Sequence, residues 1–199
     1  MEKDYAVNVL SDYSRLDEIY HLTHESLVDG GYIAPKLNAK VQASPHLDCI
    51  PETSIVITEQ NRQIVATISI TQDNSLGLPT DNYFKEETEA IRASSSDRVG
   101  VIWRIASSKE CRRNSRLIMD TVHRGTQIMY GSSCRIWLFA IAEKHVRFYN
   151  RFFDAKIVSR KITTVDQNIE IPMVLMQADV QGAWDRFAAS TKKWISSEE

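Results

Sequence analysis

Apolar side chains recur every three or four positions in three long stretches of the chain, and this spacing predicts amphipathic helices. The stretches are residues 16–29, 109–129 and 180–195. A shorter, acidic helix is expected near residues 82–93, with Asp81 able to cap its N-terminus. The pattern therefore predicts a substantial helical part in the first half, the middle and the end of the chain.

Alternating and continuous apolar runs predict the strands. Residues 54–59 and 63–71 form an expected hairpin, in which the even-numbered positions of 64–70 give one buried side. Residues 99–107 and 135–142 are more continuously apolar and are expected to lie inside the sheet. The remaining strands are expected at residues 5–10, from about Lys156 onward, and at residues 169–177.

Residues 31–52 hold three of the five prolines and show little periodicity, which predicts a long loop of the kind that often binds ligands. In the second half, strands alternate with helices, so the expected fold class is α/β (α+β) with a mixed sheet. One domain is expected, with a core in about residues 1–178 and a helix at about 180–195. Aromatic side chains of that helix either cap the core or form a dimer face: Trp184, Phe187 and Trp194.

The composition of the chain mainly excludes classes of partner and site. The chain of 199 residues is 43% hydrophobic and 25% charged, and its net charge of −2 indicates neither a nucleic-acid nor a membrane partner. No stretch approaches the ~18 apolar residues that a membrane helix needs. The three cysteines, Cys49, Cys111 and Cys134, are widely spaced without a zinc-type pattern. Reduced thiols, a cytoplasmic location and no metal are therefore expected.

The junction between the strand at 99–107 and the helix after it carries an unusual concentration of positive charge. Lys109, Arg112, Arg113 and Arg116 are expected in the first turn of that helix. Helix N-terminal amides attract anions, and added cations strengthen such a site, so a phosphate-bearing cofactor would suit it. The alternative is a solvated basic helix end.

Residues 143–157, EKHVRFYNRFFDAKI, predict a short helix, an aromatic corner and the start of a strand. Tyr149 lies in that helix. A tyrosine, whose ordinary pKa is near 10, can protonate a departing thiolate when the distance is right. Taken alone, a core aromatic with a satisfied hydroxyl is the more common explanation for such a residue.

Two further residues are candidates. Arg104 is a single charge inside the apolar run VIWRIA, and a buried charge needs a partner, either a structural carboxylate or a carboxylate of the substrate. His145 is a candidate for catalysis or for contact with the arm of a carrier. The other histidines receive no assignment: His21, His24, His46 and His123.

Four stretches together resemble the GCN5-related N-acyltransferase (GNAT) superfamily, and within it most closely the long-chain N-acyl amino acid synthases, relatives of the acyl-homoserine-lactone synthases. They span about residues 15–160. The stretches are Val28-Asp29-Gly30-Gly31-Tyr32-Ile33, the hairpin followed by Leu76-Gly77-Leu78-Pro79 and the 84–91 helix, Ile102-Trp103-Arg104-Ile105-Ala106 with its basic helix start, and His145-Val146-Arg147-Phe148-Tyr149.

The resemblance implies a twisted, mostly antiparallel sheet flanked by helices, with an acyl thioester bound where two central strands separate. It implies that Tyr149 protonates the leaving thiolate, and Arg104 is expected to be the second catalytic residue. No tightly bound cofactor is implied; the co-substrate is an acyl-phosphopantetheine on an acyl carrier protein, or an acyl-CoA. Donor-binding residues are implied on the strand, in the helix start and near the tyrosine: Ile105, Ala106, Ser107, Arg112, Arg113, Asn114, Ser115, Arg116 and His145. An acidic carrier would suit these cations and Lys144.

Two departures from the superfamily pattern matter. The pyrophosphate loop has glycines in the superfamily, whereas residues 112–117 read RRNSRL and hold none, which favours a carrier protein over coenzyme A. Relatives often carry a glutamate three residues before the strand arginine, and here Val101 stands there. A water chain, a backbone carbonyl, Glu25 or Asp29 would then serve as the base.

The resulting hypothesis is an N-acyltransferase that moves a long-chain acyl group from an acyl carrier protein to the amine of an amino acid, by direct attack. One alternative is an acetyl-CoA-dependent N-acetyltransferase. The other is a non-catalytic module that binds an acyl carrier or an acyl ligand; the missing glycines and glutamate favour it, and Tyr149 argues against it.

Overall fold

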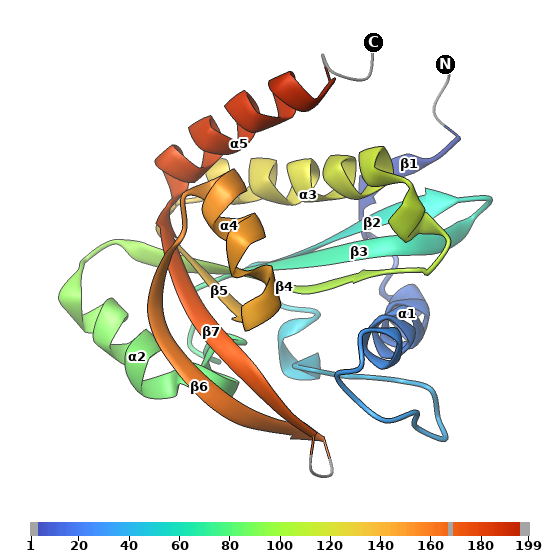
Figure 1. The fold of residues 1–199 in the computed structure, drawn as a ribbon, viewed down its shortest axis with the longest axis horizontal. Helices are drawn as coiled ribbons and strands as arrows, with labels where there is room; N and C mark the ends of the chain where they lie inside the picture. Colours follow the sequence, from blue (N-terminus) through green and yellow to red (C-terminus); the bar gives the residue numbers. More distant parts are fainter. Residues whose placement is uncertain (1–3, 167–168, 196–199) are drawn as a thin grey trace.

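The computed structural model describes residues 4–166 and 169–195. Within them the strands form one seven-stranded sheet of order β1-β2-β3-β4-β5-β7-β6 (Figure 1). Neighbouring strands are antiparallel except β4 and β5, which are parallel, so the expected mixed, mostly antiparallel sheet is confirmed. The strands are β1 (Ala6–Val9), β2 (Thr53–Gln60), β3 (Gln63–Gln72), β4 (Arg98–Ser107), β5 (Cys134–Ala142), β6 (Lys156–Asp166) and β7 (Ile169–Asp179).

Helices cover both faces of the sheet (Figure 1). The buried clusters place α3, α4 and α5 on one face and α1 and α2 on the other. The α-helices are α1 (Leu16–Asp29), α2 (Asp81–Ser94), α3 (Ser115–Tyr130), α4 (Val146–Phe153) and α5 (Val180–Ile195). No helix in the described part of the chain is long and apolar enough to cross a membrane.

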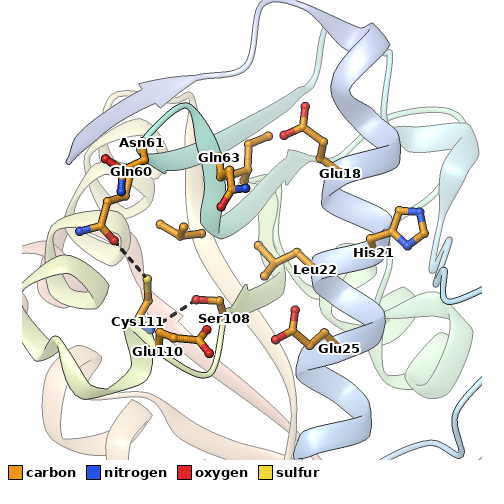
Figure 2. A pocket seen from close by; sticks show the side chains of 12 residues that line it. Glu18, His21, Leu22, Glu25, Gln60, Asn61, Gln63, Ser108, Glu110 and Cys111 are labelled. Carbon is orange, nitrogen blue, oxygen red and sulfur yellow. Dashed lines mark hydrogen bonds between the residues drawn. The ribbon is translucent and has the colours of Figure 1, made fainter. Parts of the chain in front are cut away.

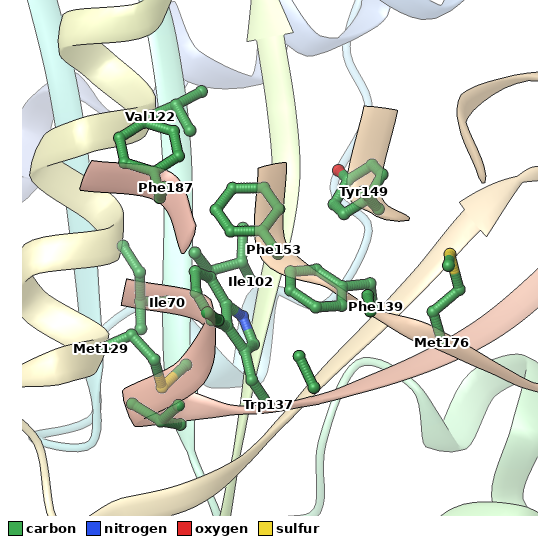
Figure 3. Packing of buried hydrophobic residues seen from close by; sticks show 14 of the residues in the cluster. Ile70, Ile102, Val122, Met129, Trp137, Phe139, Tyr149, Phe153, Met176 and Phe187 are labelled. Atoms are coloured by element: carbon green, nitrogen blue, oxygen red, sulfur yellow. The ribbon is translucent and has the colours of Figure 1, made fainter. Parts of the chain in front are cut away.

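Aromatic side chains from β5, α4 and α5 pack together on the α3–α4–α5 face (Figure 3). The rings of Phe153 and Phe187 stack with centroids 5.4 Å apart, and Trp137 lies 5.0 Å from Phe153. Because large aromatic rings bury much apolar area, this cluster fixes α4 and α5 firmly on β5. Trp184 stacks on Tyr130 of α3 at 4.9 Å, so it caps the core as Phe187 does. The side chain of Trp194 lies outside the described residues.

The parallel pair of strands separates partway along its length. The ladder between β4 and β5 runs from Arg98 and Cys134 to Val101 and Leu138, while both strands continue further. Beyond these residues the described part of the chain has no pairing between the two strands. Their backbone groups and the space between them are thereby available to a ligand.

A β-bulge interrupts β4 just past this separation. Ser69 of β3 pairs with Trp103 and Thr67 pairs with Ala106, so Arg104 and Ile105 together oppose one residue. Arg104 has a φ of +47°, in the left-handed region that non-glycine residues seldom occupy. The bulge leaves Ile105 45% exposed, whereas Arg104 is turned inward and is 8% exposed.

Three local expectations were wrong. The helix expected from Lys109 begins at Ser115, because the Asn114 side chain caps it by accepting the Leu117 N–H at 3.1 Å, and a short 3₁₀ turn precedes it. Thr80 rather than Asp81 is the N-cap of α2; the Asp81 carboxylate accepts the Leu78 N–H instead. The β2–β3 hairpin is buried on both faces, because α1 packs on the face opposite α3.

Candidate active site

A cavity of about 590 Å³ occupies the gap where β4 and β5 separate. Its walls include residues 102–105 of β4 and residues 140–142 of β5, with α3 and α4 on one side and the C-terminal end of α1 on the other. The lining includes many apolar side chains and several polar ones, which suits a ligand with a long apolar part and a reactive end.

Tyr149 is buried in the wall of this cavity. It lies in α4 and is 7% exposed. Its ring contacts Phe139 edge-on, with centroids 4.8 Å apart, and lies 5.8 Å from Phe153 (Figure 3). The helix ends at Asp154, which takes a left-handed conformation and whose N–H donates to the carbonyl of Asn150. Packing therefore fixes the position of Tyr149 along and around the helix axis.

Burial, and secondarily the neighbouring Tyr32, raise the pKa of Tyr149 above its ordinary value. The hydroxyl thus stays protonated throughout the physiological pH range and is always available as a donor. A free thiol has a pKa of about 8.5, lower than that of an ordinary tyrosine. Complete transfer of the proton from Tyr149 to a thiolate is therefore uphill, and Tyr149 needs a second proton source as it donates.

Two distant segments meet at the rim of the cavity. Tyr32 Oη and His145 Nε2 are 2.8 Å apart, and both residues line the cavity. The Lys144 ammonium lies 4.3 Å from the centroid of the Tyr32 ring and donates to the Gly30 carbonyl at 3.4 Å. Gly31 has a φ of +72°, a conformation suited to glycine, and this turn directs Tyr32 toward α4.

The predicted residue His145 therefore lies at the cavity, in a short 3₁₀ turn that precedes α4. Tyr32 was missed as a site residue. The signal in the sequence was the Gly30-Gly31 pair directly after a predicted helix, which marks a turn that could bring the next side chain back toward the sheet.

Arg104 has its partner inside the protein. Its Nη1 lies 2.6 Å from Asp48 Oδ1, and the two side chains are 0% and 1% exposed. Arg104 Nε and Nη2 also donate to Ser69 Oγ, at 3.1 and 2.8 Å, and Tyr20 Oη donates to Asp48 Oδ2 at 2.7 Å. Burial lowers the pKa of Arg104, and Asp48 opposes this shift. Of the two alternatives for Arg104, the structure thus supplies the structural carboxylate.

The other predicted donor-binding residues divide into two groups. Ile105 and Arg112 line the cavity, whereas Ala106 and Ser107, the next residues of β4, are outside its described lining. The Ser107 carbonyl accepts a hydrogen bond from Arg112 Nη2 at 3.1 Å. Arg112 also lies 3.4 Å from Asp29, an ion pair at the end of α1. Arg113, Ser115 and Arg116 are exposed outside the described lining, and the Asn114 side chain is used as the cap of α3. Lys109 is exposed before the turn.

A second cavity of about 500 Å³ lies between α1, the β2–β3 turn and residues 108–111 (Figure 2). Three carboxylates border it, those of Glu18, Glu25 and Glu110. Their negative charges would repel a phosphate group bound there. Tyr149, Arg104 and Ile105 do not border it among the described residues, so the cavity between β4 and β5 is the candidate active site.

The two acids proposed as general bases, Glu25 and Asp29, lie outside the candidate active site. Glu25 borders the second cavity, and Asp29 is paired with Arg112. Neither belongs to the described lining of the candidate active site. Val101 is buried at 1% exposure beside Leu138, in the last paired step of β4 and β5.

Comparison with solved structures shows the same fold in acyltransferases. FeeM, an N-acyl amino acid synthase from uncultured soil microbes, superposes with a TM-score of 0.72 at 14% identity, over 92% of this chain and 94% of that one. The CoA-dependent acyl-homoserine lactone synthase BjaI, with SAM and isopentyl-CoA, gives 0.62 at 12% identity over 90% and 86%. A putative GNAT-family acetyltransferase from Desulfovibrio desulfuricans gives 0.56 at 10% identity over 88% and 99%.

No curated protein matches the chain in sequence. The sequence model of the FeeM family, described as N-acyl amino acid synthase FeeM, matches residues 18–179. This match covers most of the chain and contains the cavity, Tyr149 and the buried Arg104–Asp48 pair. The chain therefore belongs to the FeeM family of N-acyl amino acid synthases and is an acyltransferase of the GNAT fold.

Proposed function

We propose that the protein transfers a long-chain acyl group from the thioester of an acyl carrier protein to the amine of an amino acid, with Tyr149 as the general acid. The observation that carries the proposal is the cavity between β4 and β5, which has Tyr149 in its wall. In this proposal residues 1–199 act as one acyltransferase domain. The reaction takes place in the cytoplasm, where thiols such as the three free cysteines stay reduced.

The geometry suggests how the reacting groups are held. The acyl chain lies along the apolar lining, and the carbonyl faces the bulge in β4, where backbone N–H groups freed from the ladder stabilise the oxyanion. The amine attacks the carbonyl carbon, the C–S bond breaks, and Tyr149 supplies a proton to the thiolate. Arg104 is a positioning residue in this proposal, because its ion pair with Asp48 holds the bulge.

The basic turn before α3 supports a carrier protein as the donor. Lys109, Arg112, Arg113 and Arg116 are exposed around the start of the helix. A phosphopantetheine arm has one phosphate and an acidic carrier surface behind it, which complements a cluster of separate cations. The absence of glycine from residues 112–117 leaves side chains where a diphosphate would approach the backbone. The CoA-dependent fold relative BjaI makes coenzyme A the donor to test beside it.

The test is intact-protein mass spectrometry of a palmitoyl-loaded acyl carrier protein incubated with this protein and the twenty amino acids. We expect the acyl group to leave the carrier and an N-palmitoyl amino acid to appear in the small-molecule fraction. The same mixture with palmitoyl-CoA or acetyl-CoA in place of the carrier identifies the donor. A carrier that stays fully loaded while acetyl-CoA is consumed would support the acetyltransferase instead; no turnover of any donor, with the carrier bound, would support the binding module.

A further inference from the structure

The candidate active site contains one side chain that can accept a proton at neutral pH. None of the described lining residues is aspartate or glutamate. The ionisable side chains in that lining are Tyr32, Tyr83, Arg104, Arg112, Lys144, His145 and Tyr149. Tyrosine, arginine and lysine side chains in general have pKa values of about 10 or above and hold their protons at neutral pH, whereas a histidine side chain, near 6.5, can accept one.

The reaction needs such a group. The amine of an amino acid is mostly an ammonium ion at neutral pH and cannot attack a carbonyl until it loses a proton. Forming the amide removes a second proton from the same nitrogen. Glu25 and Asp29, the two acids considered as bases, do not belong to the described lining of the cavity.

We propose that Tyr32 and His145 form a proton relay that deprotonates the acceptor amine. Tyr32 Oη and His145 Nε2 lie 2.8 Å apart, so the hydroxyl donates to the ring when Nε2 carries no proton. Both residues line the cavity, and His145 is exposed at the rim, where it can exchange a proton with water. The inference rests on the proposed function, since the relay serves the acyl transfer at the same site.

The protons and bonds balance as follows. One ammonium proton passes to Tyr32 Oη while the Tyr32 hydroxyl proton passes to His145 Nε2. The freed nitrogen lone pair forms the C–N bond, and the carbonyl becomes an oxyanion. The oxyanion collapses, the C–S bond breaks, and the thiolate takes the proton of Tyr149. A second proton from the nitrogen then reprotonates Tyr149. His145 releases to solvent the proton that it took from Tyr32. Each turnover therefore yields one amide, one thiol and one proton.

The surroundings of His145 favour this release. Partial burial of its ring, and then the adjacent Lys144, lower the pKa of His145 below the ordinary value. Two further cations are paired with carboxylates: Arg112, which lines the same cavity, lies 3.4 Å from Asp29, and Arg160 Nε lies 3.0 Å from Oε1 of Glu143, two residues before His145. The adjacent Lys144 ammonium disfavours a lasting imidazolium, so the proton received is passed on to water.

The test is the pH dependence of kcat for Tyr32→Phe and His145→Gln, with palmitoyl-loaded carrier protein and a saturating amino acid. We expect kcat near pH 7 to fall about 100-fold in each variant, within the usual range for general-base catalysis. We expect the deficit to shrink as the pH rises toward the pKa of the amine, because a neutral amine needs no base. In the wild type, kcat should fall only below pH 6.5, where His145 becomes protonated; in both variants this limb should be replaced by a rise of kcat that extends up to the pKa of the amine. His46→Gln, an exposed histidine outside both cavities, is the matched control.

The outcomes separate the relay from the proposed function. If the wild-type protein turns over no acyl donor, the proposed function fails. If the wild type is active and either variant keeps its kcat and its acid limb, the relay is wrong and the proposed function stands. If His145→Gln raises KM for the carrier but leaves kcat and the pH profile unchanged, His145 contacts the carrier, and the relay is likewise overturned.

Discussion

The guanidinium of Arg104 and the carboxylate of Asp48 form an ion pair 2.6 Å long that is closed to solvent on all sides. Asp48 directly follows the short 3₁₀ helix Pro45–Leu47 in the segment before β2, so the pair links this segment to the bulge of β4 and to the wall of the cavity. A buried pair of this kind is sensitive to the loss of one member, because the remaining charge is left without compensation.

Asp48→Asn should lower the free energy of unfolding by about 3–5 kcal/mol, the range found when one partner of a buried pair is removed. Urea denaturation followed by fluorescence measures this loss. Glu143→Gln, which breaks the exposed pair with Arg160, is the comparison and should change stability by less than about 1 kcal/mol. Equal, small effects in the two variants would show that the buried pair is not a structural link.

Tyr149→Phe should reduce kcat by roughly 10²–10⁴-fold while the protein still binds the loaded carrier. The substitution removes one hydroxyl and keeps the ring packing against Phe139 and Phe153. Single-turnover mass spectrometry of the carrier gives the rate. Tyr13→Phe, at an exposed tyrosine far from the cavity lining, is the control. Normal turnover in the Tyr149 variant would remove the general acid from the mechanism.

Arg113→Glu should raise KM for the acyl carrier protein on the order of tenfold and make the rate less sensitive to salt, with little change in kcat. The residue is exposed beside α3 and outside the described cavity lining, so it can touch the carrier without touching the acyl group. Steady-state kinetics at two ionic strengths measure both effects. Lys85→Glu, at an exposed residue of α2, makes the same change in net charge and is the control. A similar KM for both variants would place the carrier elsewhere.

Glu87 gives a pH-dependent test of how α2 is held against β6. Its carboxylate accepts from Lys161 Nζ at 2.8 Å and from Ser159 at 2.9 Å, and these contacts, Lys161 first, lower the pKa of Glu87. The stabilisation is therefore complete above the ordinary pKa of about 4.5 and is lost as the pH falls through the lowered value. Glu87→Gln should be less stable than the wild type at pH 7, and the difference should close in acid. Glu86→Gln, next to it and exposed, should show no such pH dependence.

Phe139→Ala should lower the free energy of unfolding by about 3–5 kcal/mol and should also reduce kcat at temperatures where the variant is folded, because Phe139 supports the Tyr149 ring. Phe84→Ala removes an equally buried ring on the opposite face of the sheet. It should cost similar stability and leave kcat unchanged. Retained kcat in the folded Phe139 variant would mean that α4 alone orients the tyrosine.

Periodicity was sufficient to predict the order of the elements and most of their bounds. The last helix lies at Val180–Ile195 and β6 begins at Lys156, as expected, because apolar spacing and the aromatic corner mark both places. The start of α3 was missed, since Lys109 to Arg113 are good helix residues and only the hydrogen bond of Asn114 decides where the helix begins. Side-chain capping is a local competition that composition does not reveal.

The candidate site was predictable where a residue stands out from its own segment and not where it depends on a partner elsewhere. Tyr149 and Arg104 stand out in this way. Asp48 lies in a loop without periodicity, and its importance comes from Arg104, which is distant in the sequence. Tyr32 likewise acquires its place through His145, 113 residues away. Contacts of this kind are set by tertiary structure, for which a single sequence holds no local pattern.

The left-handed backbone at Arg104 places two opposite requirements on one position. The backbone favours glycine there, while the carboxylate of Asp48 requires a cation. No exchange of that residue satisfies both, so position 104 is closed to redesign. Ile105, its neighbour in the bulge, faces the cavity with a partly exposed side chain and has neither constraint. A library intended to change which acyl donors or amines the enzyme accepts should therefore begin at residue 105 and leave residue 104 untouched.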